Sequence, residues 1–490
     1  MAVHKDTRLT FQETDEADKP TATYVFSGQD ARSKESPMRV DVMQDEPSTM
    51  LSTKPLLATL SDIFLPSGYP QSVSDDYLPY QIFDSLQAFC SSIAGLLSSR
   101  AVLQGVGVGN ADASPTSALL LHILQDTSGR IATILFAHRV GTALEPECKT
   151  YRLAADVFND IAMILDCLSP MVPAGVMRVS VLSTAGILRA LCGVAGGSSK
   201  ASLSAHFAKW GNLAELNAKD SSQETIISLL GMLVGSVVVS QITGFKTTWA
   251  ALLTLLTAHL ALNYTAVRAV QMTSINRQRA NIIFSTILDS PETESKDSKI
   301  PTHAEVAYQE RIFHRDGALE WTSKSHREKI GTAEIGISVS QFLKNASRTT
   351  SSSYKTSIPM EDLHTLFQNE EYILFVFSQG NYTSSKCRWH ASILLKKGCT
   401  VPSQLKAWAQ ALLAVRVLTG GYKHPEFEDL RHDGVGEVWN SVYVVVQQTL
   451  EFLNRGNRMQ GYLEGLSAKG WEVDIAALET GGRRRITSPI

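Results

Sequence analysis

Two long stretches without any charged residue constrain this chain more than any other feature. Residues 225–245 and 247–267 are each 21 residues long and contain no Asp, Glu, Lys or Arg. A helix that crosses the hydrocarbon core of a bilayer needs about 20 predominantly apolar residues, so both are long enough. Only Lys246 separates them, which favours a tight helical hairpin. We therefore predict a pair of membrane-spanning helices. The alternative is a buried hairpin in a large soluble core, because Gln241 and His259 make the stretches less apolar than typical spans.

The composition of the whole chain excludes several classes of protein. A chain of 490 residues exceeds one ordinary domain, and its net charge of −3 shows no basic excess, so we expect no nucleic-acid partner. The six cysteines have no CxxC spacing, which predicts neither a zinc site nor a disulfide framework. The GxSxG, HExxH and P-loop motifs are absent from the sequence as well. We therefore expect no enzymatic activity, no metal and no cofactor.

The N-terminal residues 1–55 are rich in Asp, Glu, Lys, Ser, Thr and Pro and show little periodicity, which predicts a disordered tail. The first residues lack the apolar core of a secretory signal and are too acidic for an organellar transit peptide. We expect a membrane location without an identifiable organelle. Arg268, Arg277 and Arg279 follow the second apolar stretch and could mark its cytoplasmic end, without fixing a topology.

Helical periodicity appears well before the two apolar stretches. Apolar residues recur at helical spacing over 80–100, and the three glycines within 105–109 should end or kink that helix. Ser114 and Pro115 then offer a helix start. Further helices are predicted over 114–125, 128–141 and 149–168, and over 176–192, 201–217, 221–243 and 246–270.

These helices show an internal duplication, with repeats over about 65–168 and 169–284. The segments 105–114 and 193–202 share the pattern GVxxGxxxAS, 88 positions apart. One match of this kind is noise, but several in the same order indicate a repeat. The further matches are 92–97 with 183–188, Asp126 with Asp220, and Lys149 with Lys246.

The pattern changes after a charged linker at 291–300. Residues 371–377 and 388–395 are short apolar runs of strand-forming residues, and the polar segment between them is typical of a hairpin loop. A helix is predicted over 403–418, and the length of 438–453 favours a helix although its valines favour a strand. The fold class that follows is an all-α, membrane-associated helical core of two tandem repeats over 56–290, with a small α+β domain over 301–490.

Polar residues in the apolar setting of the repeats are the candidate site. Several of them, beginning with Lys149, are spaced so that they fall on one face of a helix. A second set, beginning with Asn212, is spaced in a similar way. An unpaired charge in such a setting is costly, so these groups must pair with one another, face water or contact a polar ligand. The candidate ligand or pathway residues are Gly105, Gly109, Asp126, Lys149, Arg152, Asp156, Asn159, Asp160, Gly193, Gly196, Gly197, Asn212, Glu215, Lys219, Asp220, Ser222, Gln223 and Glu224.

Several long motifs in this region resemble the root UVB sensitive family. They are LPSGYPQSVSDDYLPYQIFDSLQAF, GVGVGNADASPTSALLLHILQDTSGRIATILFA, KTYRLAADVFNDIAMILD and GVAGGSSKASLSAHFAKWGNLAELNAKDSSQET. The likeness covers about 56–289 and continues weakly to Trp471. It implies a membrane- or plastid-associated protein that is linked to vitamin B6 balance and auxin transport and has no established enzymatic activity. Asn110 stands where the family pattern has Asp, which puts a role for an acid there in doubt.

Our leading hypothesis is a membrane-embedded helical repeat protein that acts as a carrier-like module for a small anionic metabolite. Duplicated helical units with interrupted helices commonly place a site at the repeat interface, and the two glycine motifs would be those interruptions. Helix N-termini there would favour an anion, and Lys149, Arg152 and Lys219 could supply countercharge. The alternative is a non-catalytic membrane scaffold that forms a homo- or hetero-oligomer with another family member. Membrane lipid is a partner in both readings.

Overall fold

The structure is a computed structural model, and it describes most of the chain. The described residues are 8–14, 20–27, 39–44, 63–106, 115–290, 300–323, 326–347, 360–379, 388–422, 424–427, 438–482 and 484–487. Gly109 of the candidate site, the predicted loop at 380–387 and most of the predicted linker therefore lie outside the described residues.

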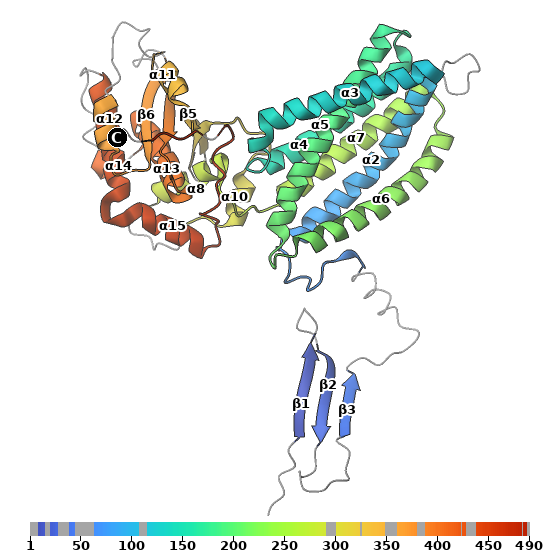
Figure 1. The fold of residues 1–490 in the computed structure, drawn as a ribbon, viewed down its shortest axis with the longest axis horizontal. Helices are drawn as coiled ribbons and strands as arrows, with labels where there is room; N and C mark the ends of the chain where they lie inside the picture. The colour runs from blue at the N-terminus through green and yellow to red at the C-terminus, as the bar shows by residue number, and fades with distance from the viewer. Residues whose placement is uncertain are drawn as a thin grey trace, which may run out of the picture. The chain divides into compact units, whose positions relative to one another are not determined.

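Three short strands near the N-terminus form an antiparallel sheet in the order β1-β2-β3 (Figure 1). They are β1 (Arg8–Thr14), β2 (Pro20–Ser27) and β3 (Arg39–Gln44). Phe11 and Phe26 meet edge to face with ring centroids 5.5 Å apart. Cross-strand aromatic pairs stabilise hairpins. The prediction of a disordered tail is wrong for these strands, because the polar composition of 1–55 concealed a short local alternation of apolar and polar residues.

Six long helices follow, each drawn as a continuous rod in Figure 1. They are α2 (Tyr77–Val106), α3 (Pro115–Val140), α4 (Cys148–Leu168), α5 (Val176–Phe207), α6 (Leu213–Gln241) and α7 (Phe245–Ala269).

The residues of the chain group into two compact units. The first comprises 1–96 and 203–259, and the second comprises 97–202 and 260–490.

Two of the helices run through residues that were predicted to interrupt them. Helix α3 replaces the two helices predicted over 114–125 and 128–141, and α5 continues through Gly193 and Gly197. A glycine inside a helix costs only about 1 kcal/mol relative to alanine, which the neighbouring turns can offset. The prediction that the second glycine motif breaks a helix is therefore wrong. Gly105, in contrast, lies at the end of α2, as predicted.

The tandem repeats remain a prediction. Each half contains long helices in succession, and Lys149 and Lys246 occupy the same position in α4 and α7, next to the first residue. The two glycine motifs, however, lie in different settings, since Gly105 is near a helix end and Gly193 is inside a helix. A shared pattern of letters therefore does not correspond here to a shared backbone position.

Among the described residues, four helices are long and apolar enough to cross a membrane. They are Tyr77–Gly105, Val176–Phe207, Leu213–Gln241 and Phe245–Ala269. The last two contain the uncharged stretches that predicted a helical hairpin, and only 242–244 separate α6 from α7. The pair of apolar helices is thus confirmed, and α2 and α5 add two candidate spans.

Glycines set the helix spacing inside each unit. In the first unit, a Cβ added to Gly231 of α6 would lie 2.7 Å from the Ser92 Cβ and 3.0 Å from the Phe89 carbonyl oxygen of α2. In the second unit, a Cβ on Gly129 of α3 would lie 3.2 Å from the Ala190 Cβ of α5. Small residues at such contacts let helix backbones approach closely, as in membrane proteins.

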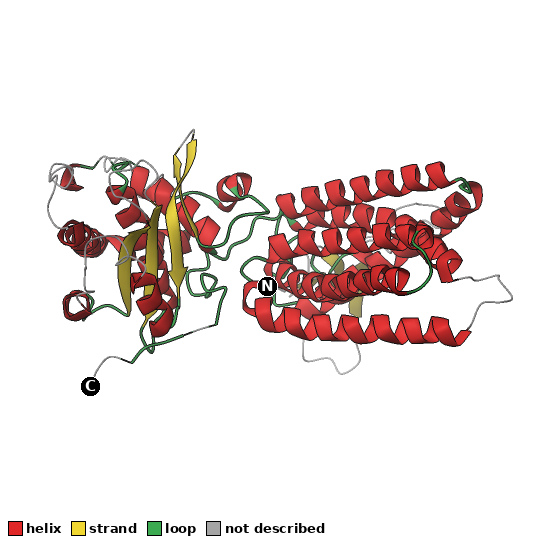
Figure 2. Ribbon diagram, turned by 90° about the horizontal axis from the view of Figure 1, so that it is seen from above, coloured by secondary structure: helices red, strands yellow, loops and turns green. Residues whose placement is uncertain are grey.

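The C-terminal elements form a four-stranded sheet with helices on both faces (Figure 2). The strand order is β4-β5-β7-β6, with β5 and β7 parallel and the other pairs antiparallel. The strands are β4 (Ala318–Ser323), β5 (His326–Ile335), β6 (Tyr372–Gln379) and β7 (Arg388–Leu395). The helices are α8 (Arg277–Asp289), α10 (His303–Gln309), α11 (Val339–Ser347), α12 (Met360–Leu366), α13 (Val401–Leu418), α14 (Val438–Asn454) and α15 (Arg458–Ala468). Single 3₁₀ turns lie at Gly141–Ala143, Ser169–Met171, Pro425–Phe427 and Arg455–Asn457.

Alternate side chains of β6 contact helices on the two faces of this sheet. The Tyr372 hydroxyl donates to Gln410 of α13 (2.6 Å), whereas Phe375 packs on Phe342 of α11 with ring centroids 5.5 Å apart. A sheet covered on both faces needs apolar residues in both registers, which explains the continuous apolar run at 371–377. The predicted strands β6 and β7 and the predicted helices α13 and α14 are confirmed.

Helix α8 belongs to this C-terminal core, although the sequence placed it with the repeats. Trp408 of α13 donates to the Asn281 side chain (2.9 Å), which itself donates to the Ala318 carbonyl of β4 (2.7 Å). Ile282 and Phe284 are buried in the same cluster. The structure therefore packs α8, which precedes the predicted linker at 291–300, with the elements that follow this linker.

Candidate functional site

Helix α4 carries the densest set of buried charged residues among the described helices. Lys149, Arg152, Asp156 and Asp160, whose spacing predicted a shared helical face, are all buried, and Asn159 is half-buried. These side chains share one face because positions three and four apart on a helix are neighbours. The face is confirmed, but its two ends have different surroundings.

The middle of that face is a cluster of opposite charges and an amide, which we call the α4 polar cluster (Arg152, Asp156, Asp160 and Asn263). Arg152 and Asp156 pair at 3.0 Å between Nη1 and Oδ1. The Asn263 amide of α7 donates to the other oxygen of Asp156. Asn263 is fully buried, and its own carbonyl oxygen has no hydrogen-bond partner among the described residues. The cluster thus holds a buried cation and an open acceptor side by side.

A second carboxylate closes the other end of α4. Asp166 is buried and accepts a hydrogen bond from the Ser98 hydroxyl of α2 (2.8 Å). Arg189 of α5 forms an ion pair with the same carboxylate. Three helices of the second unit therefore converge on one acidic side chain, which fixes their relative register.

Lys149 belongs to a different network, which we call the Glu310 network (Lys149, Arg279 and Glu310). The Lys149 ammonium donates to Glu310 (2.5 Å) and to the Val270 carbonyl (2.6 Å), and Arg279 donates to the other Glu310 oxygen (2.9 Å). Burial alone would raise the pKa of the Glu310 carboxyl, but the two cations hold that pKa at about 2. Burial lowers the pKa of Lys149. Lys149 therefore staples α4 to the C-terminal core and is not available to a solute.

Arg279 and Glu310 were not identified as partners from the sequence. Arg277 and Arg279 were read as charges at a membrane surface, whereas both are buried. Arg277 pairs with Asp316 at 2.5 Å. The signal that could have found this network is the run of polar residues in α8 between apolar neighbours, since charges in a buried helix require partners.

The polar residues predicted on α6 gather in the first unit against the segment that precedes α2. Glu215 accepts hydrogen bonds from the Ser67 backbone N–H (2.8 Å) and hydroxyl (2.7 Å). Asp220 accepts one from Gln81 of α2 (2.8 Å), and Gln223 donates to the Phe64 carbonyl. These contacts use the turn-rich motif at 65–70 as a cap on α6. The residues come together as a structural lock for two helices.

Other candidate residues lie outside both clusters. Asp126 is exposed and pairs with Arg130 on α3. Ser222 and Glu224 are exposed on α6, Lys219 is half-buried, and Asn212 is the N-cap residue of α6 without a side-chain cap bond. A Cβ added to Gly193 or Gly197 would meet no atom within 4 Å, and one on Gly196 would touch Ala155 at an ordinary 3.5 Å. These glycines therefore mark no close backbone approach.

No group of three His, Cys, Asp or Glu side chains among the described residues could hold a metal ion. A cavity of about 590 Å³ opens on the C-terminal part that contains the four-stranded sheet. Its lining mixes Glu370, Glu371, Lys396 and Lys397, most of which already pair locally, as Glu370 does with Lys406 at 2.6 Å.

Comparison with known proteins places this chain beside one family. A family model described as "Vitamin B6 photo-protection and homoeostasis domain" matches residues 51–291. RUS family member 1 of Dictyostelium discoideum is 43% identical over 258 residues, 52% of this chain and 47% of that protein. Protein root UVB sensitive 3 of Arabidopsis thaliana is 34% identical over 235 residues, 48% of this chain and 53% of that protein. The chain spans about half the length of these two relatives.

A longer and weaker match extends into the C-terminal unit. Protein root UVB sensitive 2, chloroplastic, of Arabidopsis thaliana is 24% identical over 426 residues, 86% of this chain and 83% of that protein. No solved structure matches the chain.

Proposed function

Because this chain belongs to the root UVB sensitive family, whose domain covers residues 51–291, we propose that its long helices are embedded in a membrane and that the α4 polar cluster binds a small anionic solute. The observation that carries this proposal is that the long helices bury charged and polar side chains and expose apolar ones. Charged residues inside membrane helices are costly, and where they occur they commonly line a substrate or ion path.

The exterior of the long helices supports the first half of the proposal. Leu120 and Ile134 of α3 are 61% and 67% exposed, and Leu233 and Val237 of α6 are 58% and 61% exposed. Exposed apolar patches of this kind are rare on soluble monomers and mark contact with lipid or another protein. A bilayer would cover these side chains, and each of the four candidate spans is long enough to cross its hydrocarbon core.

The chemistry of the α4 polar cluster supports the second half. Arg152 offers a guanidinium that recognises carboxylate and phosphate groups in a planar geometry. The open carbonyl oxygen of Asn263 would accept a hydrogen bond from a hydroxyl or N–H of the same solute. Solute binding would exchange the Arg152–Asp156 pair for an Arg152–solute pair. The family's link to vitamin B6 homoeostasis makes pyridoxal phosphate the first anion to test.

The test combines membrane insertion with solute flux. We expect the protein to stay with membranes after carbonate extraction and to release or take up pyridoxal phosphate in proteoliposomes. Arg152→Gln should abolish this flux. The matched control is Arg130→Gln, which breaks an exposed Arg–Asp pair of the same i,i+4 type on α3 and should leave flux unchanged. Equal flux through both variants would contradict the assignment of Arg152.

A second function, a membrane scaffold that pairs with another family member, is favoured by how completely the buried charges are paired. Asp166 has two partners from different helices, and Asp156 also has two. In the scaffold, such paired charges have the single role of locking helices together. Replacing both partners by apolar residues is then often tolerated. An Arg152→Leu/Asp156→Leu variant that folds and still rescues a null strain would favour the scaffold over the carrier.

A further inference from the structure

The segment 307–315, which begins inside α10, is fixed to the end of α7 and the start of α4. The Arg268 guanidinium of α7 donates to the carbonyl oxygens of Ala307 (3.0 Å) and Tyr308 (2.9 Å), and also to that of Glu310. The Thr150 hydroxyl of α4 donates to the Ile312 carbonyl (2.6 Å). The backbone of this segment is therefore held by side chains from two helices.

The side chains of this segment divide into buried and exposed sets. Ile312 is buried against Leu153 of α4 and Val267 of α7. Tyr308 and Phe313, in contrast, are 83% and 61% exposed. Arg311 lies between them and is exposed as well. Exposing two large aromatic rings to water is unfavourable. Their exposure therefore points to a partner molecule or a membrane that covers them.

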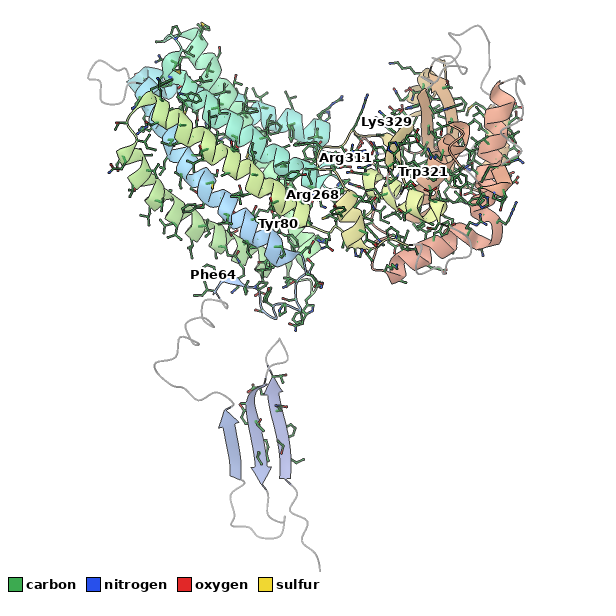
Figure 3. The ribbon with its side chains drawn as sticks, turned by 180° about the vertical axis from the view of Figure 1, so that it is seen from behind. Phe64, Tyr80, Arg268, Arg311, Trp321 and Lys329 are labelled. Atoms are coloured by element: carbon green, nitrogen blue, oxygen red, sulfur yellow. The ribbon has the colours of Figure 1, made fainter. Side chains whose placement is uncertain are left out.

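The segment lies at the end of a candidate span. Helix α7 is apolar up to Ala269, and Arg268 is in its last turn. Figure 3 marks Arg268 on α7 and Arg311 on the neighbouring segment. One turn earlier on α7, Tyr264 is 50% exposed. Tyrosine and tryptophan are enriched at the boundary between hydrocarbon and headgroups, because their rings are amphipathic.

The charge around these rings is positive. Arg311 and Arg315 are exposed. The acidic groups beside them are already engaged: Asp316 accepts from Arg277 (2.5 Å) and Thr480 (3.0 Å), and Glu310 is buried between two cations. Glu320, whose carboxylate Arg311 also attracts, pairs with Arg327 (2.6 Å). Basic residues next to a membrane are attracted to anionic headgroups.

We propose that Tyr308, Arg311, Phe313 and Arg315 form a headgroup anchor that binds anionic phospholipids at the leaflet where α7 ends. The aromatic rings enter the headgroup layer and the two arginines bind lipid phosphates and carboxylates. This inference rests on the proposed membrane embedding. It adds a lipid-binding site that is separate from the α4 polar cluster.

The experiment measures lipid binding to the full chain in detergent. Short-chain phosphatidylserine and short-chain phosphatidylcholine are titrated separately, and the rise in Tm gives a Kd for each. We expect tighter binding of phosphatidylserine. Arg311→Gln/Arg315→Gln should raise its Kd by at least about tenfold and raise the Kd for phosphatidylcholine much less, because that headgroup carries a phosphate but no net charge. Tyr308→Ser/Phe313→Ser should raise the Kd values of both lipids, because it removes the rings that enter the headgroup layer.

A matched control replaces two exposed cations elsewhere in the second unit, Lys397→Gln/Arg484→Gln, and should leave both Kd values unchanged. The Tm of each variant without lipid reports folding. An unchanged Kd for phosphatidylserine in Arg311→Gln/Arg315→Gln would overturn the anchor and leave the membrane proposal standing. Complete release of the wild-type chain by carbonate would overturn the membrane proposal itself.

Discussion

The long helices and the C-terminal α+β part of this protein treat apolar side chains in opposite ways. In the C-terminal part, Trp321, Trp408 and Phe342 are almost completely buried. On α3 and α6, Leu135 and Leu233 are 62% and 58% exposed, although nearby helices bury charged residues. Both parts obey the same preference of apolar surface to leave water. This difference is the observation on which the proposed membrane embedding of the long helices rests.

The comparison also separates two kinds of buried charge. The Glu310 network has a partner for each of its charges, so it is a staple between α4 and the C-terminal core. The α4 polar cluster leaves the Asn263 carbonyl oxygen open. An open acceptor in a buried setting has a cost that a ligand or a water molecule can relieve. That contrast is why we propose the solute site at Arg152 and Asn263 and not at Lys149.

The largest effect is expected for Glu310→Ala. This change leaves Lys149 and Arg279 buried without their counter-ion, and breaking a buried pair typically costs about 3–5 kcal/mol. The Tm of the detergent-solubilised protein measures it. The control Glu328→Ala removes an exposed partner of Arg416 and should cost about 1 kcal/mol or less. A small effect of Glu310→Ala would show that the network tolerates an uncompensated charge and is open to water.

A paired leucine experiment tests the two surroundings directly. Leu412→Ala removes a fully buried side chain from the C-terminal core and should destabilise the protein by about 2–5 kcal/mol. Leu233→Ala on the exposed face of α6 should change the Tm in detergent very little.

Leu233→Lys gives the matching test in lipid. A lysine at the middle of a span costs about 2.5–3.5 kcal/mol on insertion, so the variant should lose carbonate-resistant membrane retention. Normal retention of Leu233→Lys would place that face in water and remove the contrast between the two regions.

Gly231→Ala should separate α2 from α6 within the first unit. Its new Cβ would lie 2.7 Å from the Ser92 Cβ and 3.0 Å from the Phe89 carbonyl oxygen, so the helices must shift. Overpacking of this kind costs about 1–3 kcal/mol. Gly193→Ala is the matched control, because it meets open space inside α5 and should stabilise that helix slightly. Equal Tm values for the two variants would contradict the close α2–α6 contact.

The smallest effect concerns pH at the start of α4. Burial raises the pKa of the Glu147 carboxyl from 4.5 to about 7, although Arg279 opposes the shift. Because the folded pKa is the higher one, this group stabilises the protein most below about pH 4.5, and the contribution is lost as pH rises through about 7. Between about pH 6 and 8 the Tm should fall less in Glu147→Gln than in the wild type. The exposed neighbour variant Glu145→Gln should keep the wild-type slope.

Residue spacing along the sequence was sufficient to predict local elements. The uncharged stretches predicted α6 and α7, and alternating or continuous apolar runs predicted β6, β7 and α13. The shared polar face of α4 also followed from spacing, because helical periodicity depends only on neighbours within a few turns, but its burial did not. Glycine-rich segments misled the same reasoning at Gly193, since the cost of a glycine in a helix is small beside what packing contributes.

Partners from distant parts of the chain were decided by the tertiary structure, whereas the Arg152–Asp156 pair lies within one helix. Lys149 and Asp156 are equivalent by sequence pattern, yet one binds Glu310 and the other binds Asn263. Nothing local distinguishes them, because each partner is more than one hundred positions away in the chain. The same holds for α8, whose membership of the C-terminal core depends on Trp408 reaching Asn281. Periodicity is a local property of the chain, whereas the choice of a counter-ion or a core depends on which distant segments the fold brings together.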